Sequence, residues 1–328
     1  MLIPPKYFLT PKITKLLQSI EGSRQVIDTA ILPKEVEVNI RRRSTLRSSL
    51  FSARIEGNTL TLDELPQASS SDQKKREVLN ILKGFNFLMA RGSKKDITIK
   101  DILALQKTVM EGLIPKLDLG KFRTNLEAIF NSSGIAIYIP PKPAQISSST
   151  RKMLKFTNSS KEQFVPIRAA LTHYTFEKIH PFLDGNGRVG RLLLQAVLEK
   201  GGYGMRGLIN LEEYLDNHRS LYYQALDSSE RDVTEYLEYI LEAIDFAAAE
   251  AKTEILKKDQ LQAQDYLLPR RAEILNIIRD HNLINFNTIQ RRFMAINGRT
   301  LRYDLKQLQD AGLIKKLGST KGVYYQII

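Results

Sequence analysis

Apolar residues recur at helical spacing along most of the chain, and this pattern predicts a mainly α-helical protein. The first such run covers residues 11–32 and is ended by Pro33. A second run continues to Gly57 and Asn58, a pair that suits a helix C-terminus. Further helices are expected from 61–64, over 72–89, over 99–113 and over 166–179, with Thr98 and Asp101 spaced as a capping box.

One stretch departs from the helical pattern. Residues 120–146 hold two β-prone runs on either side of a turn cluster, Asn131-Ser132-Ser133-Gly134, and these features predict a β-hairpin. Such a hairpin either covers the core or presents an edge that pairs with an extended segment of another protein.

The C-terminal part of the chain predicts a separate small domain. Residues 246–267 are rich in Ala, Lys, Glu and Gln and fit a helical connector. Residues 268–328 then show three helical runs, 272–281, 286–293 and 299–311, and two short strands around Gly318 and Tyr324-Tyr325. This order resembles a winged helix-turn-helix domain. Its third helix would turn polar side chains toward a DNA major groove, namely Arg299, Thr300, Arg302, Tyr303 and Lys306. Docking of a protein is the alternative use of such a domain.

Composition limits the classes of protein that the chain can be. It has 328 residues and a formal charge of +13, from 49 Lys and Arg against 36 Asp and Glu, which favours polyanionic partners such as nucleotides or nucleic acid. Residues 265–328 contribute eleven cations and five acids to this excess. The absence of cysteine excludes disulfides and thiolate zinc sites and fits a cytoplasmic location. We find no signal-peptide pattern and no apolar stretch of about 18 residues, so we expect no membrane partner.

The densest chemistry lies in residues 180–191, His-Pro-Phe-Leu-Asp-Gly-Asn-Gly-Arg-Val-Gly-Arg. Its glycines favour tight turns that expose backbone N–H groups at a helix start, which is an anion-binding arrangement. Arg188 and Arg191 add cations suited to phosphate oxygens. Asp184 is an oxygen ligand of the kind Mg²⁺ prefers, and His180 is able to accept a proton near neutral pH. A purely structural turn does not require this combination, so the run predicts a nucleotide-polyphosphate site with a general base.

This run resembles the signature of the Fic family, H-x-F-x-[D/E]-G-N-G-R-x-x-R, and fills every fixed position of it. The resemblance implies a Fic-type helical bundle with the hairpin of 120–146 as its flap, plus the small C-terminal domain. It divides the chain into an N-terminal helical region (1–110), a catalytic core (111–245), a connector (246–267) and the terminal domain (268–328).

The resemblance also implies an activity, the transfer of AMP from ATP to a Ser, Thr or Tyr hydroxyl of a target protein docked on the flap. His180 would deprotonate the hydroxyl, and Asp184 would hold Mg²⁺ between the α- and β-phosphates. The remaining motif residues would contact the phosphates, namely Gly185, Asn186, Gly187, Arg188, Gly190 and Arg191.

Two outlying segments extend the resemblance. Ser52-Ala53-Arg54-Ile55-Glu56-Gly57 is similar to the Fic inhibitory helix, [S/T]-x-x-x-E-[G/N]. By that likeness Glu56 would pair with Arg191 and block the γ-phosphate position, with Ser52 anchoring the helix. Downstream, Asn217, Tyr222 and Tyr223 fall where Fic proteins hold the adenosine moiety. We interpret His173, by contrast, as a packed core residue.

The residues leave alternatives open. Glu56 would serve either as an inhibitor or as the residue that removes AMP from modified targets. The same site would also suit a transferase with another donor chemistry, or a DNA-binding regulator that only senses ATP. A homodimer is compatible with the apolar connector and the terminal domain.

Overall fold

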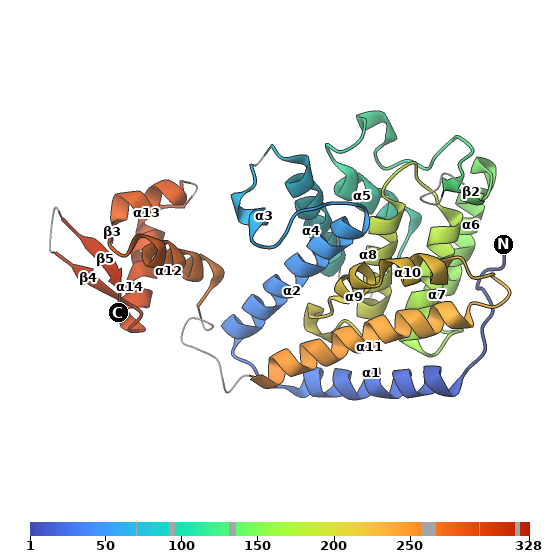
Figure 1. Ribbon diagram of the computed structural model, residues 1–328, viewed down its shortest axis with the longest axis horizontal. Helices are drawn as coiled ribbons and strands as arrows, with labels where there is room; N and C mark the ends of the chain where they lie inside the picture. The colour runs from blue at the N-terminus through green and yellow to red at the C-terminus, as the bar shows by residue number, and fades with distance from the viewer. Residues whose placement is uncertain (70, 92–95, 131–135, 258–266, 295, 319–321) are drawn as a thin grey trace. The chain divides into compact units, whose positions relative to one another are not determined.

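The structure is a computed structural model that describes every residue except 70, 92–95, 131–135, 258–266, 295 and 319–321. The described residues are mainly helical, as the pattern predicts. They separate into two compact units (Figure 1). The first unit comprises Met1–Ala30 and Arg43–Thr253, and the second comprises Ile31–Arg42 and Glu254–Ile328.

The first unit consists of helices and one hairpin. Its elements are α1 (Pro11–Thr29), α2 (Lys34–Ile55), α3 (Glu64–Gln67), α4 (Gln73–Arg91), α5 (Ile99–Met110), η1 (Lys116–Asp118), β1 (Ile129–Phe130), β2 (Ala136–Tyr138), α6 (Pro143–Thr157), α7 (Val165–Ile179), α8 (Asn186–Lys200), η2 (Met205–Gly207), α9 (Leu211–Asn217), α10 (Arg219–Leu226) and α11 (Thr234–Leu256). Helices α2 and α11 each have one end in the second unit.

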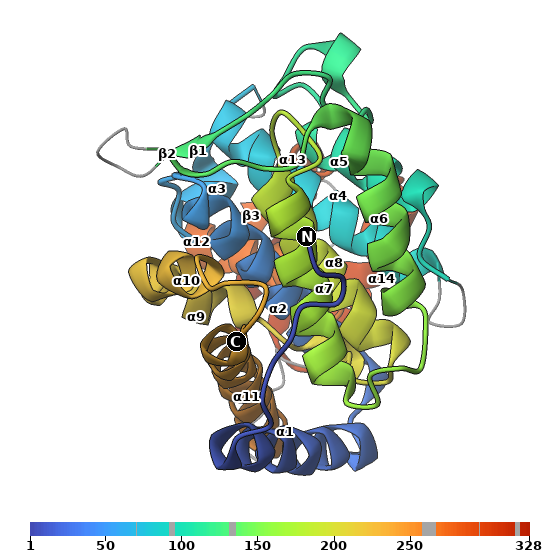
Figure 2. The ribbon, with the colours of Figure 1, turned by 90° about the vertical axis from the view of Figure 1, so that its right-hand side faces the viewer.

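Helices α7 and α8 form the centre of the first unit. They pack against each other and are joined by residues 180–185, and α4, α5 and α6 flank them (Figure 2). Every side chain of α8 from Val189 to Leu198 is buried, so the nearly all-round apolar sequence of this helix is explained by its central place. Residues 180–191 therefore comprise the short connection between these two packed helices and the beginning of α8.

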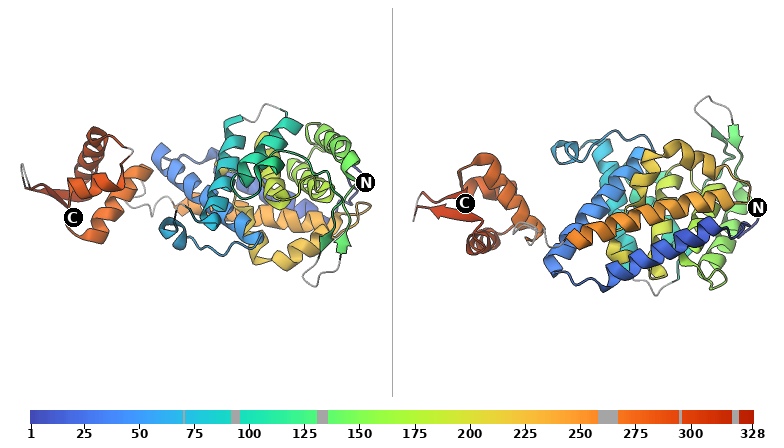
Figure 3. Two further views of the ribbon diagram at one scale, coloured as in Figure 1. Left: turned by 90° about the horizontal axis from the view of Figure 1, so that it is seen from above. Right: turned by 60° about the horizontal axis from the view of Figure 1, so that its bottom comes forward.

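The N-terminal helix is secured to α11, with which it runs side by side (Figure 3). The Thr10 hydroxyl caps α1 by accepting the Ile13 N–H and donates to Glu238 of α11 at 2.7 Å. The Lys12 ammonium lies 2.7 Å from the Glu242 carboxylate. These polar contacts supplement the apolar side chains that α1 buries, Ile13, Ile20 and Ile27.

Helix boundaries differ from the sequence prediction by up to three residues at either end. The capping box of α5 is present, with Thr98 N–H donating to the Asp101 carboxylate at 2.7 Å. However, α5 ends at Met110 instead of 113, because the Asn80 amide binds the carbonyls of Val109 and Glu111 and fixes the chain in a turn there. Likewise α1 ends at Thr29 instead of 32.

Helix α6 was missed by the sequence pattern and corrects the range expected for the hairpin. It begins at Pro143, inside residues 120–146. Two of its buried positions are threonines, Thr150 and Thr157, whose hydroxyls donate to the carbonyls of Ile146 and Met153. A helix face made partly of threonines does not show the apolar periodicity of a buried face. It nevertheless packs against the core, because the threonine hydroxyls are hydrogen-bonded within the helix.

The hairpin itself is shorter than expected. Strand β1 pairs with β2 in antiparallel register, Ile129 opposite Tyr138, with an irregularity that shifts the register at Phe130. The turn cluster Asn131-Ser132-Ser133-Gly134 lies outside the described residues. The residues expected at the adenosine moiety lie in two separate helices, since the backbone at His218 (φ −119°, ψ 37°) separates α9 from α10.

The second unit contains the three helices and the two strands expected beyond 268, and a further short strand at Ile284–Asn285 that the sequence pattern did not predict. Its elements are α12 (Pro269–His281), β3 (Ile284–Asn285), α13 (Phe286–Arg292), α14 (Gly298–Asp310), β4 (Ile314–Leu317) and β5 (Tyr324–Ile327). The strands form one antiparallel sheet in the order β3-β5-β4. Ile278, Ile289, Leu301 and Ile314 belong to its common apolar core. Throughout the described parts of both units, no helix combines the length and apolarity that crossing a lipid bilayer requires.

Candidate functional site

The loop between α7 and α8 is closed by its own side chains. The Asn186 amide donates to the Phe182 carbonyl at 2.7 Å and accepts from the Phe182 N–H at 2.9 Å. Phe182 is fully buried, with its ring 5.7 Å from Phe122 and 6.3 Å from Phe176. Gly185 adopts φ +88°, and a Cβ there would meet the Met110 sulfur at 2.7 Å, so the turn depends on glycine.

His180 is held as a neutral proton acceptor. It caps α7 with φ +46°, a left-handed conformation that is uncommon outside glycine. Its Nδ1 lies 3.3 Å from the Glu177 carbonyl, which accepts only from an N–H, so Nε2 is the nitrogen left to take a proton. Burial lowers the pKa of His180 to about 4 and exceeds the opposing effects of the Glu177 carbonyl, Glu56 and Asp184.

Arg123 ties the hairpin to the His180 backbone. It donates from Nε to the His180 carbonyl at 2.8 Å, from Nη1 to the Asn125 carbonyl at 2.8 Å and from Nη2 to the Pro141 carbonyl at 2.7 Å. The backbone N–H of Arg123 donates to the Pro181 carbonyl at 2.9 Å. One buried guanidinium therefore joins both ends of the flap to the loop that carries the base.

The start of α8 has the character of an anion site. Gly185 in the left-handed conformation precedes the N–H groups of Asn186 and Gly187, which begin the helix. The Glu56 carboxylate already lies there, because a Cβ built on Gly187 would stand 2.3 Å from Glu56 Oε1 and 3.0 Å from Arg191 Nη1. The space beside the Gly187 backbone is therefore occupied by a carboxylate of the same chain.

Arg191 is fully buried and holds this carboxylate. Its Nη2 donates to Glu56 Oε1 at 2.8 Å and to the Ser52 carbonyl at 2.9 Å, and its Nε donates to the Ser52 hydroxyl at 2.9 Å. Burial by itself would raise the pKa of Glu56, but the guanidinium groups of Arg191 and Arg188 outweigh it and hold that pKa below its ordinary value. The predicted contact between Glu56 and Arg191 is confirmed.

Arg188 is bound by two carboxylates. Its Nη2 donates to Asp184 Oδ1 at 2.6 Å and its Nη1 to Glu77 Oε1 at 2.5 Å. The Asp184 side chain is 51 % exposed, whereas that of Arg188 is 7 % exposed. Asp184 is thus the accessible oxygen ligand at the mouth of the site.

A metal would need ligands besides those of the chain. Among the residues with described placement, no group of three or more His, Asp or Glu side chains could hold a metal ion. Mg²⁺ commonly takes one or two carboxylates and completes its shell with phosphate oxygens and water, so Asp184 alone is compatible with a metal that arrives with a nucleotide.

The residues expected at the nucleoside are in different environments. The hydroxyl of Tyr223, a half-exposed residue, donates to the Ile55 carbonyl at 3.3 Å, at the end of α2 beside Glu56. Tyr222 is buried with its hydroxyl 3.1 Å from His173 Nε2. Asn217 is exposed at the end of α9. His173 has no exposed surface, which confirms that it is a packed residue.

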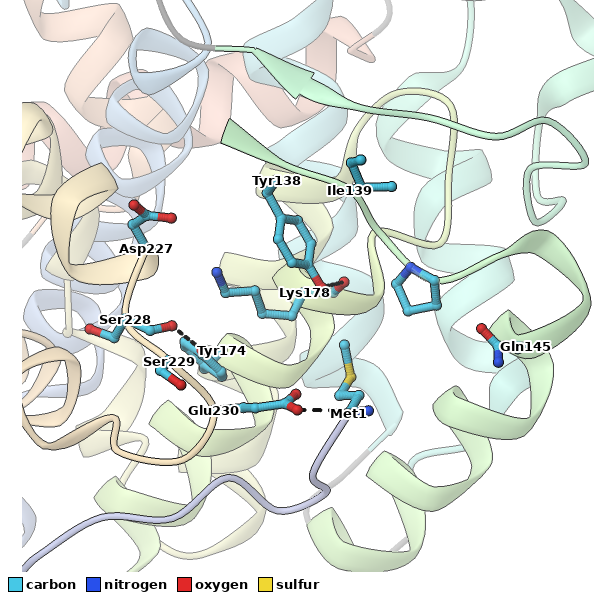
Figure 4. A pocket seen from close by; sticks show the side chains of 11 residues that line it. Met1, Tyr138, Ile139, Gln145, Tyr174, Lys178, Asp227, Ser228, Ser229 and Glu230 are labelled. Carbon is cyan, nitrogen blue, oxygen red and sulfur yellow. Dashed lines mark hydrogen bonds and ion pairs between the residues drawn. The ribbon is translucent and has the colours of Figure 1, made fainter. Parts of the chain in front are cut away.

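A cavity of about 470 Å³ lies beside the flap, between β2, α7 and the turn after α10 (Figure 4). The Tyr138 hydroxyl of β2 donates to the Lys178 carbonyl at 2.9 Å, two residues before His180. The Lys178 ammonium lies 4.4 Å from the centre of the Tyr138 ring and 5.5 Å from that of Tyr174. Ile139, the next residue of the flap, is 72 % exposed at the same cavity.

The sequence pattern did not predict two features of the site, namely the presence of Glu77 and the hydrogen bonds made by Arg123. Glu77 stands four residues before Ile81 and eight before Phe85, on the apolar stripe of α4. A carboxylate in such a stripe indicates a cation nearby in the folded protein, so the sequence indicates that Glu77 has a basic partner but not which residue that partner is. The side chain of Asn186, expected to face phosphates, instead binds the Phe182 backbone, which leaves its backbone N–H for an anion.

Comparison with known proteins gives a consistent result. Residues 96–198 match the Fic/DOC family. The chain is 30 % identical over 198 residues to "Protein adenylyltransferase Fic" of Drosophila yakuba and of Drosophila melanogaster, and these alignments cover 57 % of this chain and 39 % of each relative. The chain thus spans about two fifths of the length of the curated relatives it matches.

Solved structures show the same fold at lower identity. A Fic family protein from Desulfovibrio desulfuricans G20 is 22 % identical with a TM-score of 0.67, and the match covers 99 % of this chain and 98 % of that one. Fic-1 of C. elegans, residues 134–508, is 21 % identical with a TM-score of 0.60 over 73 % of this chain and 71 % of that one.

Proposed function

We propose that the protein, whose residues 96–198 match the Fic/DOC family, transfers AMP from ATP to a hydroxyl group of a target protein and that Glu56 holds it inactive at rest. One observation carries the proposal. A neutral histidine and a helix N-terminus suited to phosphate lie on the same loop, and a carboxylate of the chain lies at that N-terminus.

The proposed chemistry follows from the atoms available. His180 Nε2 takes the proton of the target hydroxyl, whose oxygen attacks the α-phosphorus of ATP. The bond from that phosphorus to the bridging oxygen breaks, and pyrophosphate leaves. The backbone N–H groups at Gly187 and the guanidinium groups of Arg188 and Arg191 neutralise the charge that collects on it.

Asp184 is the residue that would hold Mg²⁺, and its exposed carboxylate fits this role. When bound, the ion would neutralise phosphate charge as a Lewis acid. Tyr223, Tyr222 and Asn217 are proposed for the adenosine moiety. Tyr223 is the best placed of the three, since its ring is half exposed next to the end of α2.

The target is proposed to dock on the flap. Strand β2 approaches His180 through the bond from Tyr138 to the Lys178 carbonyl, so an extended segment paired with this strand would pass close to the base. Main-chain pairing fixes register without demanding a sequence. The cavity beside Tyr138 and Ile139 supports this placement, because it offers room for a neighbouring side chain of the target.

Autoinhibition rests on the position of Glu56. Its carboxylate neutralises Arg191 and lies within van der Waals reach of the Gly187 backbone, so a phosphate group at that place would be excluded by volume and by like charge. Removal of the carboxylate leaves both the space and the cation to ATP.

The test uses the Glu56→Gly protein with ATP labelled at either the α- or the γ-phosphate, in the presence of Mg²⁺. Label from the α position on protein, at least about tenfold above the native chain, is expected. The His180→Ala version of the same variant should lose the transfer, because the base is absent. Label from the γ position would indicate that the protein transfers phosphate. Absence of label from both positions would indicate that the protein binds ATP only as a sensor.

Glu56 has a second candidate role, the removal of AMP from a modified target. A carboxylate 2.8 Å from Arg191 at the phosphate site is placed to orient a water molecule. Release of AMP from a modified target by the native chain, but not by Glu56→Ala, would establish this activity.

The second unit has a candidate partner of its own, DNA, through a winged helix-turn-helix arrangement. On α14 the exposed side chains include Arg299, Arg302, Tyr303 and Lys306, while Leu301, Leu305 and Leu308 face the core. A cavity of about 360 Å³ is lined by Arg302 and Lys316 among others, and none of its described lining residues is acidic. Binding to duplex DNA that weakens steeply with salt, and is lost in Arg299→Ala/Lys306→Ala, would support this partner.

A further inference from the structure

Glu77 joins two parts of the site that are distant in sequence. Its Oε1 accepts from Arg188 Nη1 at 2.5 Å, and its Oε2 accepts from the Asn58 amide at 2.8 Å. Asn58 follows Glu56 by two residues. We propose that Glu77 is a positioning residue that ties residues 52–58, the segment carrying Glu56, to Arg188. This inference rests on the proposed function, since it gives both motif arginines a role toward ATP.

Asn58 makes the segment side of this link rigid. It is 8 % exposed, its Oδ1 accepts the Leu60 N–H at 3.0 Å, and its Nδ2 also donates to the Lys74 carbonyl at 3.0 Å. The N–H groups of Glu56 and Asn58 both donate to the Ala53 carbonyl, at 3.0 and 3.1 Å. The turn that follows α2 is therefore fastened to α4 through the Glu77 carboxylate and the Lys74 carbonyl, and of these two only Glu77 also binds Arg188.

The arginine side of the link fixes a guanidinium group. Arg188 divides its two terminal nitrogens between Glu77 and Asp184, and its side chain is almost completely buried. Asp184 is also the proposed metal ligand. Glu77 is thus the partner able to keep Arg188 in place while Asp184 serves another contact. The Arg188 Nε is buried with no hydrogen-bond partner among the described residues, so the two carboxylates hold this guanidinium through its terminal nitrogens alone.

Glu77 therefore has opposite effects in the two states. In the resting protein it stabilises residues 52–58 and so opposes ATP. Once Glu56 is absent, its remaining effect is to hold Arg188 toward the phosphates, which favours transfer. A side chain that only maintained the fold would act in the same direction in both states.

The experiment compares Glu77→Gln in the native chain and in Glu56→Gly. Glutamine keeps the volume but has one carbonyl oxygen, so it cannot accept from both Arg188 and Asn58. Without nucleotide, hydrogen–deuterium exchange of a peptide spanning residues 54–60 should speed up about tenfold in Glu77→Gln, the equivalent of one lost charge-assisted bond. ATP affinity of the native chain should rise. In Glu56→Gly, the same change should raise the KM for ATP or lower kcat.

Two further variants serve as controls for this experiment. Asn80→Ala, on the same helix, removes a buried amide that donates to the carbonyls of Val109 and Glu111, and it should leave exchange of 54–60 unchanged. Asn58→Ala loosens the segment but leaves Glu77 on Arg188, so it should speed exchange without impairing Glu56→Gly. It also replaces Glu77→Gln in the exchange test if that variant does not fold.

Unchanged exchange in both Glu77→Gln and Asn58→Ala would overturn the link, and so would effects of one sign in both backgrounds. Equal acceleration by Asn80→Ala would reduce Glu77 to a fold-maintaining residue and likewise overturn it. Failure of Glu56→Gly to transfer AMP would count against the proposed function instead, since the exchange measurement needs no nucleotide.

Discussion

The Nε of Arg123 donates to the carbonyl oxygen of His180 at 2.8 Å, and this single bond connects the flap to the residue proposed as the base. His180 has φ +46°, so its backbone is held in a conformation that needs support from its surroundings. Arg123 provides that support while also binding the carbonyls of Asn125 and Pro141.

Arg123→Met should therefore impair both stability and transfer. It leaves three carbonyl oxygens without this donor, and we expect the free energy of unfolding to fall by about 3 kcal/mol and kcat in the Glu56→Gly background to fall at least about tenfold. Urea denaturation and the labelled-ATP assay measure the two effects. Arg151→Met, at an exposed site on α6, is the control. A variant with native kcat would contradict the positioning role.

The pH profile of transfer should lack the usual histidine limb. Because burial lowers the pKa of His180 to about 4, the imidazole is neutral and competent at any pH well above that value. We expect kcat/KM of Glu56→Gly to be flat from about pH 6 to 8 and to fall only in more acidic solution. The Glu56 carboxylate is one of the groups that raise the pKa of His180, so its removal should not shift the acidic limb of the pH profile to higher pH. A limb centred near 6.5 would show that His180 is solvated in the active state.

Gly187→Ala should separate displacement of Glu56 from opening of the site. The added methyl group would stand 2.3 Å from Glu56 Oε1 and must push it away. The same methyl group fills the phosphate position, so we expect no gain in ATP affinity, unlike the gain in Glu56→Gly. Isothermal titration with ATP measures both variants. ATP binding by Gly187→Ala as tight as by Glu56→Gly would mean that the phosphate does not use this position.

Glu177 should make the protein less stable as the pH rises. Burial raises its pKa to about 8, against an unfolded value of 4.5, and Glu56 adds to this increase while Arg191 opposes it. The folded state holds the proton more tightly, so the stability that Glu177 contributes is complete below pH 4.5 and is lost as the pH rises through about 8. Glu177→Gln cannot ionise. Its stability relative to the native chain should rise between pH 5 and 8, by at most about 1.4 kcal/mol per pH unit. Urea midpoints at pH 5, 6.5 and 8 give the comparison, and parallel curves would contradict it.

Local signals were sufficient for much of the fold. The capping box at Thr98, the break at Pro33 and the three helices beyond 268 depend on neighbours in sequence, and the structure has them. The contact between Glu56 and Arg191 was also expected, from the family resemblance. Helix α6 was missed because Thr150 and Thr157 occupy its buried face with satisfied hydroxyls.

Long-range polar partners were beyond the sequence. Nothing near Arg188 indicates that Glu77, 111 residues away, holds it. Nothing near Asn186 decides whether its amide faces a ligand or the Phe182 backbone. Such choices depend on which buried donors and acceptors remain once the helices have packed, and only the folded arrangement determines them.

The amide of Asn186 closes the loop of residues 182–186 onto itself, whereas residues 52–58 contact α8 through Arg191. The proposed chemistry and the proposed restraint are thereby encoded in separate stretches of the chain. Substitutions in residues 52–58 would then change the proposed resting block and leave the loop that carries His180 unaltered. In a lineage that faces a new signal, the response can change by mutation of the restraint alone.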